Sequence, residues 1–221
     1  TTLFRSTQGA YPPGSTFKIV TALSYLKAHG SIDGYDYNCE GSITMDGHTI
    51  TCYDGEVHGE EDFTTAFAKS CNSAFASIGV DLGKSKLTQT AESLLFNSKL
   101  PIPIEYNKSK FDLGEHPGKP LLMQTSIGQG NTLVSPMHMA MIVSAIANDG
   151  VLMKPYYVDH VENVNGDVVK TTKPAEYKRI LESSEATVMQ NLMEAVVNQG
   201  TASSLSGDNY SAARSEERRV G

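Results

Sequence analysis

The sequence predicts a fold of the α/β class, more strictly α+β, in which helices and antiparallel strand pairs occupy separate stretches of the chain. Apolar residues recur at helical spacing or in continuous runs in four stretches, near residues 15–29, 61–82, 135–150 and 183–198. Short stretches of β-forming residues flank two dipeptides typical of hairpin loops, Asp46-Gly47 and Asn165-Gly166. The 221 residues are enough for one domain or one and a half.

The composition argues against several classes of function. Hydrophobic residues make up 39% of the chain and charged residues 19%, as in an ordinary globular protein. The net charge of −7 and the lack of any Lys/Arg-rich run argue against a nucleic-acid partner. No stretch approaches the ~20 apolar residues of a membrane span. Three cysteines are too few for a disulfide scaffold and leave at least one unpaired.

The first predicted helix begins near Ser15, because the Pro-Pro-Gly run at residues 12–14 disfavours a helix upstream of it. Apolar residues cover nearly the whole circumference of residues 17–26, which predicts a helix buried in the middle of a domain. Ser15 and Lys18 are three residues apart, so their side chains should share one face of this helix.

Burial of this helix would make Ser15 and Lys18 a reactive pair. A desolvated lysine should have a lowered pKa, because burial disfavours the charged ammonium. A neutral amine one turn from a serine hydroxyl can accept its proton, and the helix N-terminus favours the negative charge that develops there. The pair is therefore a candidate nucleophile and base. The alternative is that Ser15 only caps the helix and Lys18 extends to the surface.

The predicted hairpin at residues 42–51 turns at residues 46–47, and this register would place Cys39 opposite Asp54, two positions from Cys52. A Cys39–Cys52 disulfide would therefore need a bulge or a longer loop. A second alternative is a zinc site, whose ligands would be Cys39, His48, Cys52 and His58. These residues lack a standard ligand spacing, so we expect no metal.

The rest of the chain should be mainly helical. The stretch 61–82 should be helical but break at residues 69–72. Further expected elements are a short helix at 86–96, an irregular stretch at 97–120, a helix at 135–150, a hairpin at 157–170, a helix at 183–198 and an extended segment at 201–213.

The break at residues 69–72 contains Ser70 and Asn72. If the connection is short, both side chains can face one cleft. A hydroxyl there could relay a proton, and an amide could bond to a substrate amide or to Lys18. The alternative is that both are mid-helix polar residues or a local cap.

Several stretches, in this order along the chain, resemble the penicillin-binding protein transpeptidase domain. The Ser-x-x-Lys sequence at residues 15–18, with the run that precedes it from residue 8, is similar to the first motif of that family. Residues 69–75 resemble its Ser-x-Asn motif, residues 125–136 the stretch leading into a helix behind the site, and residues 200–202 the segment before its third motif. The likeness covers about residues 7–213. It is greatest to the monofunctional, class B elongation type.

The resemblance implies an antiparallel sheet flanked by helices, with a mostly helical subdomain and with the sheet incomplete in this chain. It implies that Ser15 is the acylated nucleophile and Lys18 its general base. Ser70 would relay a proton, Asn72 would contact Lys18, and both would bind the peptide stem. The implied reaction is attack on the D-Ala-D-Ala amide of a peptidoglycan stem peptide, followed by acyl transfer to an amine on a neighbouring strand. β-Lactams would acylate Ser15 as mimics of D-Ala-D-Ala, and no cofactor is implied.

The chain departs from the family because it contains no Lys-Thr-Gly or Lys-Ser-Gly. In the family, the strand that carries this tripeptide binds the substrate carboxylate and supplies one N–H of the oxyanion hole. Loss of one such donor typically costs about 10²–10³ in rate. We interpret residues 1–6 and 214–221 as non-native sequence around a partial, inactive domain of residues 7–213. A natural charged tail is the alternative.

Two other functions stay open. One is a class D β-lactamase or D,D-carboxypeptidase, which residues 15–18 would suit, although residues 70–72 favour a penicillin-binding protein. The other is a β-lactam sensor domain, for which acylation is the signal. Expected partners are stem peptides, β-lactam antibiotics and glycosyltransferase or cell-elongation proteins. The expected location is the extracytoplasmic face of the bacterial cell membrane, with an N-terminal anchor outside this chain, and that location would permit a disulfide.

Overall fold

The computed structural model describes residues 4–207 and 212–215. Its helices are α1 (Lys18–His29), α2 (Phe63–Ala68), α3 (Asn72–Ser93), α4 (Lys119–Ser126), α5 (Pro136–Ala147) and α6 (Ser183–Asn198), with single turns η1 (Phe4–Gln8), η2 (Gly14–Phe17), η3 (Tyr53–Gly55) and η4 (Ser203–Leu205). Its strands are β1 (Asp36–Cys39), β2 (Ser42–Met45), β3 (His48–Thr51), β4 (Gly59–Asp62), β5 (Val151–Met153), β6 (His160–Glu162), β7 (Val168–Thr171) and β8 (Glu176–Arg179).

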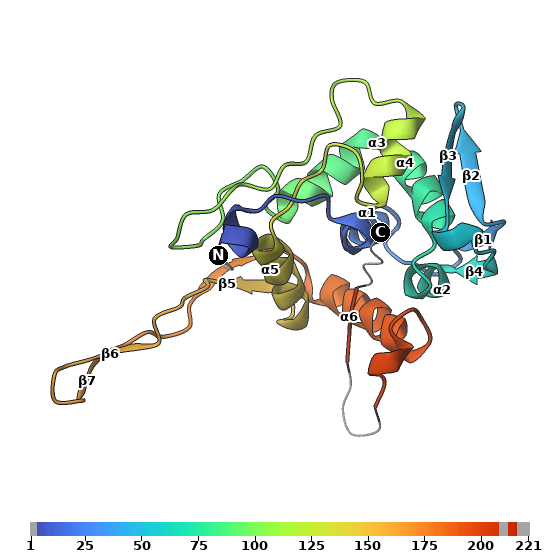
Figure 1. Ribbon diagram of the computed structural model, residues 1–221. Coiled ribbons are helices and arrows are strands. Elements are labelled where there is room, and N and C mark those ends of the chain that lie inside the picture. The colour runs from blue at the N-terminus through green and yellow to red at the C-terminus, as the bar shows by residue number, and fades with distance from the viewer. Residues whose placement is uncertain (1–3, 208–211, 216–221) are drawn as a thin grey trace.

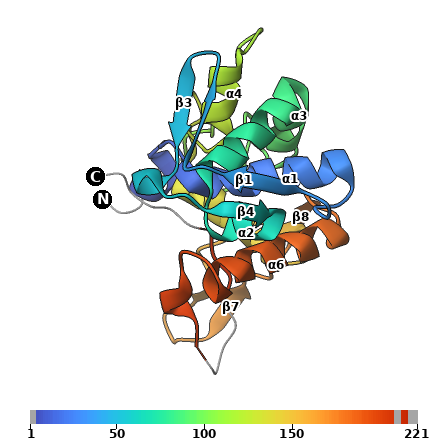
Figure 2. The same ribbon diagram turned by 90° about the vertical axis from the view of Figure 1, so that its right-hand side faces the viewer.

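Helix α1 runs through the middle of the molecule, as its apolar circumference predicts. Phe17, Ile19 and Leu23 are fully buried. Helices α3 and α4 contact α1 on one side and α6 contacts it on another, so almost every direction is filled by protein (Figures 1 and 2). Gly30 adopts a left-handed conformation (φ 77°) after the last turn, which ends the helix where a Gly C-cap is expected.

Within the described residues, the strands form four separate two-stranded antiparallel sheets: β1–β4, β2–β3, β5–β8 and β6–β7. The β2–β3 hairpin has the predicted register, with Met45 opposite His48 and the backbone N–H of Cys52 bonded to the Gly41 carbonyl. The β6–β7 hairpin, predicted from Asn165-Gly166, projects away from the body of the molecule (Figure 1).

Several helix predictions are confirmed. Helix α6 has the expected bounds, and α5 begins with Pro136 after Ser135, whose side chain accepts a hydrogen bond from the His138 N–H. The expected break at residues 69–72 separates α2 from α3. The stretch between α3 and α4 forms no helix and only an isolated bridge between Lys110 and Leu133.

Other predictions were wrong. Cys39 does not lie opposite Asp54; it pairs with Gly59 of β4, because the chain leaves the β2–β3 hairpin and returns as a second strand pair. Glu61 lies in β4 rather than in a helix. The separate helix expected at 86–96 is confirmed in part: non-helical backbone at Gly83 divides α3 in two, and the second half ends at Ser93 rather than at residue 96.

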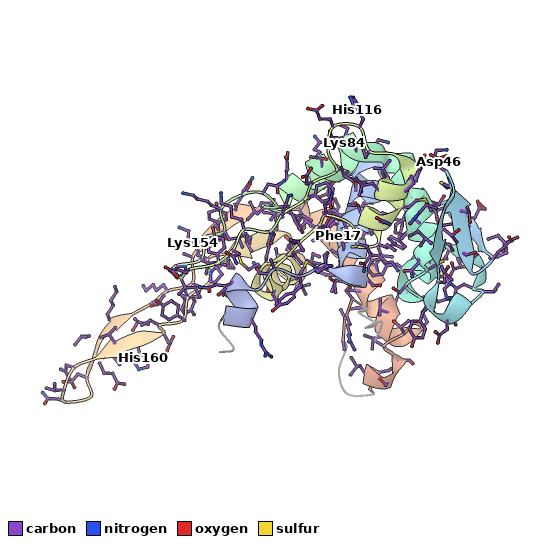
Figure 3. The ribbon with its side chains drawn as sticks, turned by 45° about the horizontal axis from the view of Figure 1, so that its top comes forward. Phe17, Asp46, Lys84, His116, Lys154 and His160 are labelled. Atoms are coloured by element: carbon purple, nitrogen blue, oxygen red, sulfur yellow. The ribbon has the colours of Figure 1, made fainter. Side chains whose placement is uncertain are left out.

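Helix α4 and the pairing of β5 with β8 were not predicted. Among the described residues, no helix combines the length and the apolar character that crossing a bilayer requires. Phe17 lies in the interior of the molecule, whereas Asp46 lies at the tip of β2–β3 and His160 lies out on the β6–β7 hairpin (Figure 3).

Candidate active site

Ser15 lies on η2, the single 3₁₀ turn that leads directly into α1. Its position is fixed from behind by the chain segment at residues 126–128. The Gly14 N–H donates to the Gly128 carbonyl at 3.0 Å, and the Thr21 hydroxyl donates to the Ser126 carbonyl at 2.8 Å. Gly128 has φ +77°, and a Cβ there would lie 1.9 Å from the Gly14 carbonyl oxygen. Only glycine fits this close approach.

Lys18 begins α1 and is only 2% exposed. Its amine donates three hydrogen bonds: to the Ser70 carbonyl at 2.6 Å, to Asn72 Oδ1 at 2.7 Å and to Ser70 Oγ at 2.9 Å. The Phe75 ring lies 5.5 Å from the same nitrogen. The structure therefore brings Lys18 together with Ser70 and Asn72, which are more than fifty residues away in sequence.

Burial lowers the pKa of Lys18 from 10.5 to about 7, although the nearby Cys71, Cys52 and Glu61 side chains act in the opposite direction. The physical cause is that the low-dielectric interior penalises the ammonium more than the neutral amine. Near neutral pH, a substantial fraction of Lys18 is therefore an uncharged amine that can accept a proton.

The connection between α2 and α3 presents Ser70 and Asn72. Ser70 has φ 56°, a left-handed conformation that is uncommon for a residue other than glycine. The Ser70 N–H bonds to the Phe67 carbonyl and the Cys71 N–H to the Ala66 carbonyl, so the turn is held by α2 itself. Asn72 Nδ2 donates to the Thr51 carbonyl of β3 at 3.1 Å, which directs Oδ1 towards Lys18. Strained backbone of this kind is concentrated at functional sites.

Ser15, Ser70 and Asn72 line one pocket of about 240 Å³, together with residues of the β3–β4 connection. The pocket brings together the three surface-accessible residues of the predicted site, and Lys18 lies buried beneath it. Sequence reasoning missed the contribution of Gly128, although the Gly-x-Gly pattern at residues 128–130 was a signal for a close backbone approach.

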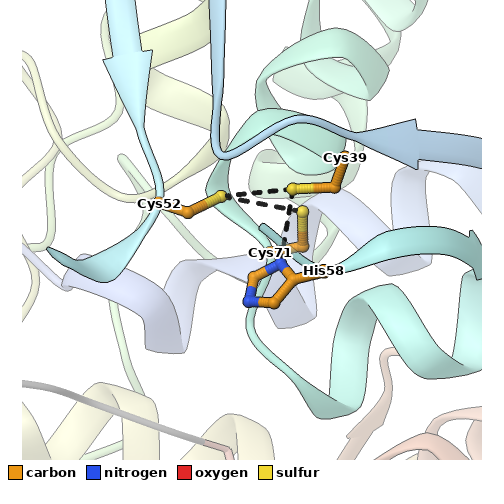
Figure 4. A group of neighbouring side chains, drawn as sticks. All are labelled: Cys39, Cys52, His58 and Cys71. Atoms are coloured by element: carbon orange, nitrogen blue, oxygen red, sulfur yellow. Dashed lines mark hydrogen bonds between the residues drawn. The ribbon is translucent and has the colours of Figure 1, made fainter. Parts of the chain in front are cut away.

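Cys52 lines this pocket, Cys39 and Cys71 lie next to Cys52, and all three are free thiols. Cys39 and Cys52, the pair considered as a possible disulfide, have their sulfurs 3.7 Å apart, against about 2.05 Å in an S–S bond. Cys71, between Ser70 and Asn72, lies 3.8 Å from Cys52, and His58 joins the same group (Figure 4). His48, which the sequence placed in a candidate zinc site, instead contacts Gln124 at 3.1 Å.

The fold and the site define a class of protein: an α+β domain that carries Ser-x-x-Lys at the start of a buried helix and a second serine against the lysine amine. The sequence profile described as "Penicillin binding protein transpeptidase domain" matches residues 2–215. The chain belongs to the penicillin-binding protein transpeptidase domain family.

Individual relatives agree with this assignment. "Peptidoglycan D,D-transpeptidase PbpA" of Mycobacterium tuberculosis is 31% identical over 194 residues, covering 86% of this chain and 39% of PbpA. "Stage V sporulation protein D" of Bacillus subtilis is 28% identical over 204 residues, covering 90% of this chain and 31% of that protein. The chain thus spans less than half the length of these curated relatives.

Solved structures show the same fold. The D,D-transpeptidase domain of a peptidoglycan glycosyltransferase from Eggerthella lenta superimposes with a TM-score of 0.87 at 26% identity, covering 98% of this chain and 56% of that one. An imipenem acyl-enzyme complex of penicillin-binding protein A from M. tuberculosis superimposes with a TM-score of 0.83 at 27% identity, covering 95% of this chain and 48% of that one.

Proposed function

We propose that this chain carries the nucleophile-bearing part of a serine D,D-transpeptidase domain, which cross-links peptidoglycan stem peptides through an acyl-enzyme. The observation that carries the proposal is the environment of Lys18, a buried amine with a pKa of about 7. Its contacts to Ser70 and Asn72 supply the two neighbours that the chemistry requires. A base with a pKa near the working pH is the most effective proton acceptor.

In the proposed first step, the Ser15 hydroxyl attacks the carbonyl of the D-Ala-D-Ala amide while its proton passes to Lys18. The tetrahedral intermediate collapses, the C–N bond breaks, and the departing D-Ala amine takes a proton through the Ser70 hydroxyl, which contacts Lys18 at 2.9 Å. In the second step an acceptor amine attacks the Ser15 ester and releases the cross-linked peptide. Asn72 binds the peptide stem and fixes the lysine amine.

The relatives support both the reaction and the inhibitor class. PbpA of M. tuberculosis and of Mycolicibacterium smegmatis are named peptidoglycan D,D-transpeptidases. Penicillin-binding protein A has been solved as acyl-enzyme complexes with imipenem, ceftriaxone and penicillin G. We therefore propose β-lactams as acylating ligands of Ser15, and glycosyltransferase or cell-elongation proteins as partners at the extracytoplasmic face of the membrane.

The 221 residues contain no Lys-Thr-Gly or Lys-Ser-Gly. We propose that this chain alone acylates slowly or not at all, because one donor of the oxyanion hole contributes about 10²–10³ in rate. The parent coding sequence, read through codon 213 from an independent clone, should continue into one of these tripeptides.

The test is acylation by penicillin G of the product encoded by that parent sequence, followed by intact-mass measurement and peptide mapping. The expected adduct lies on Ser15, is absent from Ser15→Ala and persists in a control, Ser93→Ala, on α3. The acylation rate should rise with pH through about 7 as Lys18 loses its proton. A folded product that carries the third motif but takes no adduct on Ser15 would overturn the proposal, and rapid hydrolysis of the adduct would assign a β-lactamase instead.

A further inference from the structure

Four side chains with metal-binding atoms converge beside the candidate active site (Figure 4). Cys39 ends β1, Cys52 follows β3, His58 precedes β4, and Cys71 is the N-cap of α3. Their ligand atoms, three Sγ and one imidazole nitrogen, all lie within 4.8 Å of one another. The three cysteines are buried, and the His58 side chain is only 4% exposed.

The spacing of these atoms is that of a metal tetrahedron rather than of a disulfide. With Zn–S of about 2.3 Å and Zn–N of about 2.0–2.1 Å, a tetrahedral zinc site has S···S edges of about 3.8 Å and S···N edges of about 3.5 Å. Cys52 Sγ lies 3.7 Å from Cys39 Sγ and 3.8 Å from Cys71 Sγ. Cys39 Sγ lies 3.4 Å from His58 Nδ1. Three of the six edges of the tetrahedron therefore have the required lengths without any movement.

Hydrogen-bond donors around the sulfurs are placed to stabilise thiolates. The backbone N–H of Gly41 donates to Cys39 Sγ at 3.4 Å, and that of Ala74 donates to Cys71 Sγ at 3.5 Å. The Ser73 hydroxyl lies 3.2 to 3.5 Å from all three sulfurs. Outer-shell donors of this kind fix the orientation of metal ligands and tune the metal.

His58 presents Nδ1 to the sulfurs, and its other nitrogen, Nε2, lies 3.6 Å from the Glu56 carboxylate. A carboxylate on the far side of the ring is the usual partner of a metal-bound histidine, because it fixes the tautomer that leaves the near nitrogen free. A second carboxylate flanks the same ring, because Glu61 Oε1 lies 3.7 Å from Nδ1.

A buried carboxylate, Glu61, lies against the same histidine. The Glu61 side chain is fully buried, and among the described residues neither of its oxygens has a hydrogen-bond partner. Its Oε1 lies 3.7 Å from His58 Nδ1. Glu61 therefore borders the cluster from β4 and is not one of its four ligands.

We propose that Cys39, Cys52, His58 and Cys71 form a closed Cys₃His site for Zn²⁺. Binding makes three Zn–S bonds and one Zn–N bond and releases the thiol protons to solvent, with no change of oxidation state. The site ties the ends of two strand pairs to the α2–α3 connection. Because Cys71 lies between Ser70 and Asn72, the metal would hold both residues in place.

The sequence could not reveal this ligand set. Three of its members belong to the zinc site considered from sequence, but the fourth is Cys71 and not His48, and the spacing of residues 39, 52, 58 and 71 matches no standard zinc motif. Only the close approach of the N-terminus of α3 to the two strand pairs brings Cys71 to the other ligands.

The test is metal analysis of the tag-free 221-residue chain, reduced, loaded with ZnSO₄ and dialysed against metal-free buffer. We expect about one zinc per chain, and at least about a 100-fold loss of affinity in Cys71→Ser and His58→Ala. The matched control is His48→Ala, which removes a histidine of the neighbouring hairpin and should bind zinc as the unaltered chain does.

Cobalt substitution keeps the proposal testable if a ligand variant fails to fold. Co²⁺ added to the unaltered, reduced chain should produce the sulfur-to-cobalt charge-transfer absorption and the intense visible bands of a tetrahedral thiolate site. A folded, reduced chain that retains no zinc, or that gives only the weak spectrum of octahedral Co²⁺, would overturn the proposal. A Cys39–Cys52 disulfide, found by mass in protein purified without reductant and persisting in the presence of zinc, would also overturn it.

Discussion

Replacing Lys18 by methionine tests the central electrostatic feature of the site through folding stability alone. The pKa of Lys18 is lowered by burial from 10.5 to about 7, so between these values the unfolded chain binds one more proton than the folded chain. Stability must then rise with pH in this window, by up to about 1.4 kcal/mol per pH unit. Integrated from about pH 7 to about pH 9, the contribution of Lys18 to the free energy of unfolding grows by about 2 kcal/mol.

Methionine keeps the length and apolar volume of the lysine stem but does not titrate, so Lys18→Met should lack this increase. The assay is urea unfolding of both proteins at several pH values across the window, read as the difference between the two curves. Other titrating groups contribute to both proteins and cancel. Lys84→Met, which removes an exposed lysine on α3, controls for the loss of one positive charge. Parallel curves for the unaltered chain and Lys18→Met would refute the reasoning, because Lys18 would then be charged in the folded state.

Three further substitutions have definite expected outcomes. Gly128→Ala would place a Cβ 1.9 Å from the Gly14 carbonyl oxygen at φ +77°. In the product that carries the third motif, this change should lower the rate of Ser15 acylation at least about tenfold. Gly166→Ala, with a similar φ but open space around it, should leave that rate unchanged, and equal rates for the two variants would contradict the argument. Phe17→Ala, at a fully buried position, should lower the free energy of unfolding by about 3–5 kcal/mol in urea titrations, and a loss below about 1 kcal/mol would show that the core closes around it. Asp62→Ala removes the N-cap of α2, whose carboxylate accepts a hydrogen bond from the Thr65 N–H at 2.7 Å. The free energy of unfolding should fall by about 1 kcal/mol in the same assay. No change would show that water replaces the cap.

The sequence predicted well the elements whose signals are local. Helix α6 was predicted with its observed bounds, because its apolar stripe indicates the buried face and the glycine that follows indicates where the helix ends. The β2–β3 register followed from the two-residue turn at residues 46–47. The break before Asn72 was visible because polar residues interrupt two apolar stretches.

Features that depend on distant segments were not predictable. β5 and β8 are three and four residues long and pair across more than twenty residues of intervening chain, so neither has a distinctive local pattern. Cys39 was misplaced because the β2–β3 register was extended past the hairpin to a residue that pairs with β4 instead.

In the candidate site too, contacts between residues close in sequence were predictable and contacts between distant residues were not. Ser15 and Lys18 could be paired from their spacing, because both lie on one helical turn. The three bonds from Lys18 to the α2–α3 connection join residues 52 and 54 positions apart, and no spacing rule predicts them. They depend on how α1 packs against α3, which is a property of the whole core.

The direction of the hydrogen bond between Lys18 and Ser70 Oγ depends on whether Lys18 is charged, because three acceptors surround the Lys18 nitrogen. Two of them, the Ser70 carbonyl and Asn72 Oδ1, can only accept. A charged amine has three N–H groups and donates to all three acceptors, whereas a neutral amine has two N–H groups and a lone pair. In the neutral amine, both N–H groups donate to the Ser70 carbonyl and to Asn72 Oδ1, so the lone pair faces the Ser70 hydroxyl. Ser70 Oγ, 2.9 Å from the nitrogen, then changes from hydrogen-bond acceptor to donor. Loss of one proton from Lys18 therefore reverses the polarity of this contact and re-aims the Ser70 proton, with no movement of a heavy atom.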